Sequence, residues 1–252
     1  MVNGASLTMP YVEPYLIQCV RMALEHIEDP QLRTDAKAYC GQEGQHFRQH
    51  KRFNELLIAQ GYSELRENEE QMQREFDSFL AKRSLKFNLA YTAGFETMAL
   101  AIGHWLSDER EFLFGGSDPR VASLILWHFV EEIEHKNVAI DVYRAVYGSN
   151  TWRIIGLCAA TGHVVYHARK AYRSMMIHDG TWTSIRARMR LWRMVGGFLR
   201  VVLPHLARSC APSHDPREIA DPKWFTGWMT AYRNDTETVP VLNTNNLGAE
   251  LV

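Results

Sequence analysis

Two stretches of this chain carry the same combination of carboxylate and imidazole side chains: residues 41–50, GQEGQHFRQH, and residues 127–136, WHFVEEIEHK. Each contains a Glu-x-x-His pair, formed by Glu43 with His46 and by Glu132 with His135. Side chains three or four positions apart share one face of a helix. Both stretches therefore predict a helix that presents metal-ligating side chains along one face.

A single glutamate precedes each pair by about the length of a helical hairpin. Glu13 stands thirty positions before Glu43, and Glu96 stands thirty-six positions before Glu132. Glu96 lies in the apolar segment 91–99, YTAGFETMA, where a carboxylate without a partner would be costly. In ferritin-like bundles, two Glu-x-x-His pairs and two further glutamates hold two iron or manganese ions. The pattern predicts an all-α, ferritin-like bundle with additional C-terminal helices and a di-metal carboxylate centre.

The predicted metal ligands are acidic and histidine side chains from four helices: Glu13, Glu43, His46, His50, Glu96, Glu132 and His135. One Glu-x-x-His pair alone usually belongs to a solvated helix face, and only the two matched halves favour metal binding. His50 and His128 could each be a further ligand, a donor to a ligand, or a core histidine bonded to a backbone carbonyl. His50 is favoured as a ligand or close neighbour because it shares a face with His46.

Helices are predicted along most of the chain, at about residues 10–28, 33–60, 64–82, 84–107, 119–147, 150–178, 183–208 and 221–233. Asp29-Pro30 and Asp118-Pro119 each predict an N-cap followed by proline at the first helical position. Gly61, Gly148 and Gly180 predict helix C-termini. We expect one helical domain at 1–235, with a metal-binding core at 8–148, extra helices at 149–235 and a flexible tail at 236–252.

The cysteines and the N-terminus indicate the compartment. Cys19, Cys40, Cys158 and Cys210 lack CxxC spacing, so neither a disulfide framework nor a zinc knuckle is predicted. No signal peptide is predicted in residues 1–6, and the longest apolar run, residues 154–166, is too short to be predicted as a membrane span. A cytoplasmic protein is expected.

Charge is unevenly distributed, although the formal net charge is only −1. Residues 151–210 carry ten Lys or Arg side chains against one acid, Asp179. These basic helices could pack beside the acidic residues 64–77, rest on an anionic inner-membrane surface, or receive an anionic group of a small-molecule substrate. The helix at 186–200 is basic on one side, with Leu191, Trp192, Val195 and Leu199 opposite. Nucleic-acid binding is not expected, and the sequence leaves a homodimer open.

His163 and His167 form an i, i+4 pair in the predicted helix 150–178. They could be a second metal site, but no carboxylate accompanies them on that face. Core histidines or the lining of a substrate cavity are the favoured interpretations. His214 is assigned to a capped loop.

Several stretches together resemble a known family: residues 3–13, 29–33, 41–50, 127–136 and 138–143. They are similar to bacterial proteins described as predicted metal-dependent hydrolases, whose ligand pattern looks ferritin-like. The resemblance is specific over most of residues 3–150 and continues as a general helical match to about residue 235. It implies metal binding at Glu13, Glu43, His46, Glu96, Glu132 and His135, with His50 near by. The chain departs from the family pattern at Met9–Glu13 and before His214.

The donor set guides the expected chemistry. Carboxylates and imidazoles without a thiolate suit two iron ions, with manganese or zinc as alternatives. We expect an oxygen-activating oxidase or monooxygenase that acts on a small or lipid-like apolar substrate and uses an electron donor. The alternatives are a metal-dependent hydrolase of an ester, amide or phosphoester, and a non-catalytic metal-binding bundle.

Overall fold

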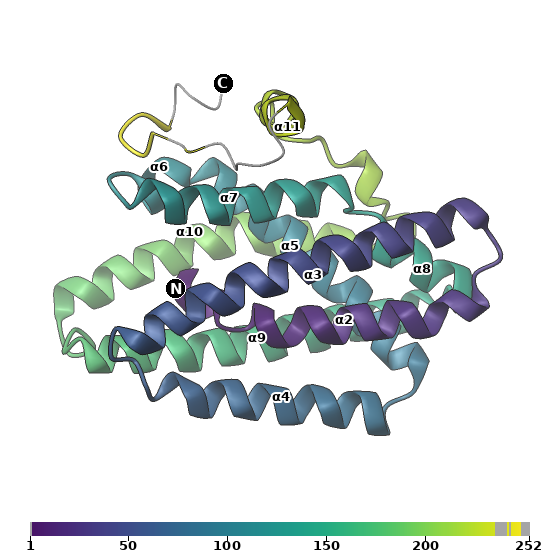
Figure 1. Cartoon of the computed structure of the whole chain (residues 1–252), viewed down its shortest axis with the longest axis horizontal. Helices are drawn as coiled ribbons and strands as arrows, with labels where there is room; N and C mark the ends of the chain where they lie inside the picture. Colours follow the sequence, from purple (N-terminus) through teal and green to yellow (C-terminus); the bar gives the residue numbers. More distant parts are fainter. Residues whose placement is uncertain (1, 235–240, 242, 248–252) are drawn as a thin grey trace. The chain divides into compact units, whose positions relative to one another are not determined.

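A computed structural model describes residues 2–234, 241 and 243–247 of the chain (Figure 1). All regular elements within these residues are helices, which confirms the predicted all-α fold. The chain divides into two compact units: unit 1 comprises Met1–Glu96 and Val138–Gly197, and unit 2 comprises Thr97–Asn137 and Phe198–Val252. Two such units can belong to one domain, so the single domain at 1–235 and its ferritin-like arrangement stay predictions.

Unit 1 contains α1 (Val2–Ser6), α2 (Met9–Ala23), η1 (Leu24–His26), α3 (Pro30–Ala59), α4 (Leu65–Lys82), α8 (Val138–Val146) and α9 (Asn150–His178). Unit 2 contains α6 (Arg110–Phe114), α7 (Pro119–Glu134), η2 (Pro216–Glu218) and α11 (Phe225–Asn234). Two long helices, α5 (Leu85–Asp108) and α10 (Ile185–Ser209), begin in unit 1 and end in unit 2. The short α1 and α6 are not among the predicted helices.

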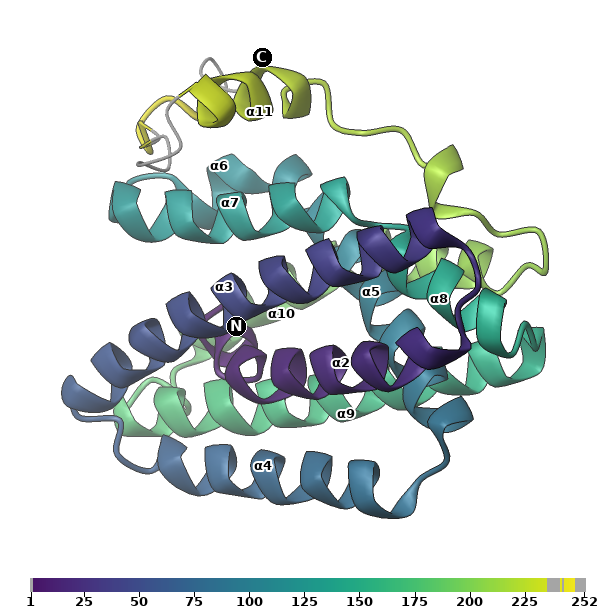
Figure 2. The same cartoon turned by 45° about the vertical axis from the view of Figure 1, so that its right-hand side comes forward.

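The core of unit 1 forms around α2, which packs against α3, α4 and α8. Its buried side chains recur with helical spacing: Val12, Glu13, Tyr15, Leu16, Cys19, Val20 and Ala23. The ring of Tyr15 lies 4.8 Å from Phe76 of α4 and 5.3 Å from Tyr91 of α5, measured between centroids. Helix α9 runs alongside α4 and also packs against α1 (Figures 1 and 2). This arrangement brings the polar faces of α4 and α9 together.

The predicted helix boundaries are largely confirmed by their caps. The Asp29 carboxylate accepts hydrogen bonds from the amides of Gln31 and Leu32, and the Asp118 carboxylate accepts one from Arg120. Both caps are followed by proline at the first helical turn. Gly61, Gly148 and Gly180 follow α3, α8 and α9 with φ of +111°, +65° and +64°, a backbone region that favours glycine at a helix end.

One predicted helix, residues 119–147, is wrong because the structure divides it into α7 and α8. Residues 135–137 form a turn, with His135 as the C-cap of α7. Within unit 2, Lys136 donates to the Ile219 carbonyl at 2.8 Å and pairs with Asp221 at 2.7 Å. Because neither glycine nor proline marks this position, the break depends on tertiary contacts that the sequence pattern does not show.

Unit 2 is held together by contacts between distant segments. The Trp224 indole donates to Ser107 Oγ at 2.7 Å, and Phe198 packs edge-on against Trp105. Most of the predicted tail at 236–252 lies outside the described residues. Its described part includes Thr244, whose hydroxyl donates to the Ser117 carbonyl at 2.8 Å. No helix among the described residues has the length and hydropathy that crossing a membrane requires.

Candidate metal centre

Three of the predicted ligands meet in the interior of unit 1. Glu13 of α2 and Glu43 and His46 of α3 each offer one ligand atom, and these three atoms lie within 4.8 Å of one another. All three residues are completely buried. The Nδ1 atom of His46 lies 3.8 Å from Oε2 of Glu43. The first half of the predicted ligand set is therefore brought together as the sequence indicated.

The helical repeat explains why α3 presents these groups inward. Its buried positions follow one face: Ala36, Tyr39, Cys40, Glu43, His46, His50, Asn54 and Leu57. From Glu43 to Asn54 the buried positions are polar, where apolar side chains would normally stabilise the packing. A buried polar stripe of this length is costly unless its members are bonded to each other or to a ligand.

His50 extends the cluster towards α1. Its ligand nitrogen lies within 4.8 Å of a Glu13 carboxylate oxygen. The Nδ1 atom lies 2.8 Å from Ser6 Oγ, and the Ser6 hydroxyl is also 3.3 Å from Asn54 Oδ1. A metal bound by His50 would therefore use Nε2, with Ser6 orienting the ring. Ser6 was not among the predicted site residues.

Glu96 joins the cluster from α5. One of its oxygens lies within 4.8 Å of a Glu43 oxygen, and its Oε1 accepts a 2.6 Å hydrogen bond from the hydroxyl of Tyr39. Tyr39 is completely buried and stands one helical turn before Glu43. Tyr39 was not among the predicted site residues, although its i, i+4 spacing from Glu43 places it on the ligand face.

Unit 2 carries the second Glu-x-x-His pair. Glu132 Oε1 lies 2.9 Å from Nε2 of His128, and Glu132 Oε2 lies 3.2 Å from Nε2 of His135. Burial alone would raise the pKa of Glu132, but the contacts with His128 and His135 hold that pKa well below its ordinary value. His128 therefore lies beside a predicted ligand, Glu132. A single centre that uses ligands of both units stays a prediction.

The donor chemistry of unit 1 fits a metal ion. Glu43 has carboxylate neighbours in both Glu13 and Glu96, and the exposed fractions of the three residues are 0%, 0% and 4%. Ionised carboxylates at such distances repel one another strongly inside a protein, so they require protons or a cation between them. Oxygen and imidazole donors suit iron, manganese or zinc.

Comparison with known proteins adds a family assignment. A family model described as a predicted metal-dependent hydrolase matches residues 1–220. The matched range includes all seven predicted ligands. No curated protein and no solved structure matches the chain.

Proposed function

The chain belongs to the predicted metal-dependent hydrolase family, and from this premise we propose that it hydrolyses an ester, amide or phosphoester bond. The observation that carries the proposal is the buried group of Glu13, Glu43 and His46. When bound there, a divalent ion would polarise the bond to be cleaved and make a nearby water molecule more acidic. Metal-dependent hydrolysis is what the description of the family predicts, whereas the type of bond cleaved is our inference.

The protein side chains would have distinct tasks. Glu13 and Glu43 would neutralise and hold the ion, while His46 would add a neutral nitrogen donor. The hydrogen bond from Tyr39 would fix the Glu96 carboxylate in one orientation beside Glu43. The interior position would limit access of bulk water, which strengthens electrostatic interactions with a substrate.

We further propose that Glu132 and His135 complete the ligand set. The support is the matched pattern of glutamate, hairpin and Glu-x-x-His in the two halves of the sequence. Further support comes from the contacts of Glu132 in α7 with His128 in the same helix and with His135 at its C-cap. Removal of this second pair should therefore reduce metal content even though Glu13, Glu43 and His46 remain.

The donor set also supports a second candidate function, oxidation by a di-iron centre. The Glu13, Glu43, His46, His50 and Glu96 cluster contains three carboxylates and two imidazoles and no thiolate. This composition is typical of di-iron and di-manganese carboxylate proteins. Such a reaction would need dioxygen and an electron donor, and hydrolysis would need neither.

The two candidates can be separated with one protein preparation. The chain would be stripped of metal, reloaded separately with Zn²⁺, Mn²⁺ or Fe²⁺, and assayed on p-nitrophenyl esters, a phosphodiester and an anilide with and without oxygen. We expect hydrolysis that requires metal and proceeds without oxygen. His46→Ala should abolish it, while Glu67→Gln on the exposed side of α4 should retain it. Oxygen consumption by the iron form alone, with no hydrolysis by any form, would favour oxidation.

Other sequence-based expectations concern the setting of the reaction. A small-molecule substrate with an anionic group, a cytoplasmic location, peripheral contact with the inner membrane face and a homodimer all stay predictions.

A further inference from the structure

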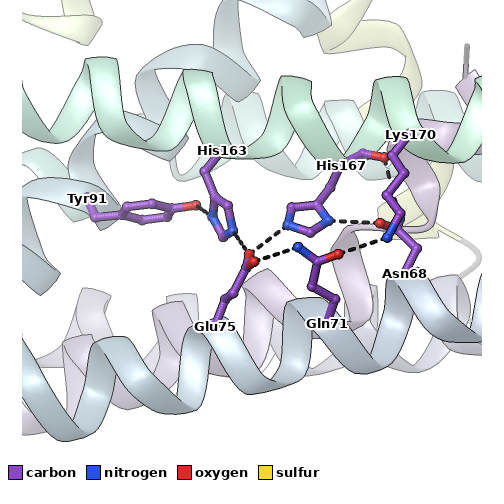
Figure 3. Close-up of polar contacts among 7 residues, drawn as sticks. All are labelled: Asn68, Gln71, Glu75, Tyr91, His163, His167 and Lys170. Carbon is purple, nitrogen blue, oxygen red and sulfur yellow. Dashed lines mark hydrogen bonds and ion pairs between the residues drawn. The ribbon is translucent and has the colours of Figure 1, made fainter.

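A second group of metal-ligating side chains lies between α4 and α9, entirely within unit 1. Oε2 of Glu75 lies 2.7 Å from Nε2 of His163 and 2.7 Å from Nε2 of His167 (Figure 3). The two histidines stand one helical turn apart on α9, and the carboxylate reaches them from α4. The sequence showed the histidine pair, and its missing carboxylate is Glu75, 88 positions before His163.

We propose that Glu75, His163 and His167 form a second binding site for a divalent transition-metal ion, with Zn²⁺ as the best chemical match. Two imidazole nitrogens and one carboxylate oxygen are a donor set that holds zinc with a fourth position left for water or substrate. The three ligand atoms lie within 4.8 Å of one another. This site shares no residue with the Glu13, Glu43 and His46 cluster, so it does not depend on the proposed hydrolysis.

The atoms of these side chains that would not bind the metal, Nδ1 of each histidine and Oε1 of Glu75, contact neighbouring polar groups (Figure 3). The hydroxyl of Tyr91 lies 2.8 Å from His163 Nδ1, and Asn68 Oδ1 lies 2.9 Å from His167 Nδ1. On α4, Gln71 donates to Oε1 of Glu75 at 2.8 Å and accepts a 2.8 Å hydrogen bond from Lys170. Hydrogen bonds of this kind orient metal ligands and are typical of metal sites in proteins.

Hydrogen-bond accounting at His167 favours a cation in the cluster. The amide nitrogen of Asn68 faces the His167 carbonyl at 3.4 Å, which directs Asn68 Oδ1 towards the ring. His167 Nδ1 must then carry the proton of that hydrogen bond, so Nε2 of a neutral ring presents a lone pair to the Glu75 carboxylate. Two acceptors 2.7 Å apart require either a second proton on the ring, as in an imidazolium, or a metal ion bound by both. A metal ion satisfies both, and it leaves each imidazole neutral.

The surroundings suit a site that is open on one side. The exposed side-chain fractions are 34% for Glu75, 13% for His163 and 0% for His167. The rings of Phe76 and Phe79 lie 5.0 Å and 5.4 Å from the His163 ring, between centroids. An ion held here would have aromatic side chains behind it and solvent access near Glu75, which fits a fourth, exchangeable ligand.

Zinc binding by the full chain provides the test. Metal-free wild type, Glu75→Gln and the double variant His163→Gln/His167→Gln would be dialysed against buffered Zn²⁺, and bound metal would be counted by mass spectrometry. We expect wild type to bind one more equivalent than either variant. Zn²⁺ should also raise the Tm of wild type more than that of the variants, because an ion that binds only the folded state stabilises it. Circular dichroism of each metal-free variant would verify its helical content.

One control variant and one variant of a supporting residue make the result specific. Glu67→Gln changes an acid of α4 whose side chain is 83% exposed, and it should keep the wild-type zinc content. Tyr91→Phe removes only the hydroxyl beside His163 and should weaken zinc binding at this site by roughly tenfold.

Equal zinc content and equal Tm increase in wild type, Glu75→Gln and the double histidine variant would overturn the proposal. The cluster would then be an imidazolium–carboxylate pair that joins α4 to α9. Metal at the Glu13, Glu43 and His46 cluster should persist in all these variants, so loss of that centre would be recognised separately.

Discussion

Gly156 of α9 packs directly on the backbone of Ala90 in α5. A Cβ atom built on Gly156 would overlap the carbonyl oxygen of Ala90, and one built on Gly94 would lie 2.5 Å from the backbone nitrogen and Cα of Leu157. The two helices therefore touch backbone to backbone within unit 1. Glu96 follows Gly94 by two positions, and His163 follows Gly156 by two helical turns, so this contact helps to position residues of both clusters.

Gly94→Ala and Gly156→Ala should each destabilise the protein because the new methyl group can be accommodated only by moving a helix. We expect a loss of about 1–3 kcal/mol or more in the free energy of unfolding, measured by urea denaturation. Gly162→Ala on the same helix is a matched control, since nothing lies within 4 Å of a Cβ built there. That substitution should be neutral or stabilise by up to about 1 kcal/mol through helix propensity. A similar effect at all three positions would argue against the close contact.

Tyr39→Phe should weaken metal binding at the Glu13, Glu43 and His46 cluster while leaving the fold intact. The substitution removes only the hydroxyl that donates to Glu96 at 2.6 Å, and loss of such a supporting bond typically lowers metal affinity by roughly 10- to 100-fold. Competition with a chromogenic chelator would measure the change. Tyr143→Phe removes another buried tyrosine hydroxyl, which donates to the Ser149 carbonyl at 2.6 Å, and it should retain wild-type affinity. Equal affinity in both variants would contradict a supporting role for Tyr39.

Cys19 should make the folded protein less stable in alkali. Burial raises the pKa of its thiol from 9.0 to about 12. Below pH 8 the thiol is protonated in both states, but above pH 9 the unfolded chain loses the proton that the folded chain keeps, so rising pH favours unfolding. Between pH 8 and pH 10 this thiol should lower the free energy of unfolding by about 1.4 kcal/mol.

The comparison of wild type with Cys19→Ala isolates that contribution. The advantage of wild type over the variant in urea denaturation should shrink by about 1.4 kcal/mol between pH 8 and pH 10. Cys158→Ala, which removes an exposed thiol, provides a control with the pH dependence of wild type. A constant difference between wild type and Cys19→Ala at both pH values would refute the assignment.

The predicted membrane contact implies that the first part of α10 binds anionic vesicles. Ile185, Met189 and Trp192 share one face of this helix and are 77%, 68% and 63% exposed. Trp192 was predicted to lie with apolar residues opposite the arginines, and its side chain is at the surface. An exposed apolar face flanked by arginines is typical of helices that lie on anionic bilayers.

Sedimentation with phosphatidylserine vesicles would measure this binding. We expect it at low salt, with weakening at moderate salt because the attraction is electrostatic. Arg190→Glu/Arg193→Glu should abolish it, while Lys51→Glu/Arg52→Glu, an equal change of charge on α3, should not. Absence of vesicle binding by wild type at low salt would remove the membrane interpretation.

Local spacing was sufficient to predict most helices and to predict which side chains of metal-ligating type share a helix face. The positions of Glu43, His46 and His50 on one face of α3 follow from the helical repeat, and the repeat also places the partners of Glu132 within reach along α7. Asp29-Pro30 and Asp118-Pro119 marked helix starts because each cap is made by residues adjacent in sequence. The prediction of one continuous helix over residues 119–147 was wrong at His135, because the turn there contains neither glycine nor proline.

Which residues share a helix face follows from the amino-acid sequence alone, because backbone geometry sets that relationship within a few residues. Glu43 and His46 are one such pair, and His163 and His167 are another. Which faces meet is visible only in the folded chain: Tyr39 contacts Glu96, and Glu75 contacts the histidine pair from another helix. These pairings depend on helix packing, including the contact at Gly94 and Gly156, and helix packing is set by side chains distant in sequence.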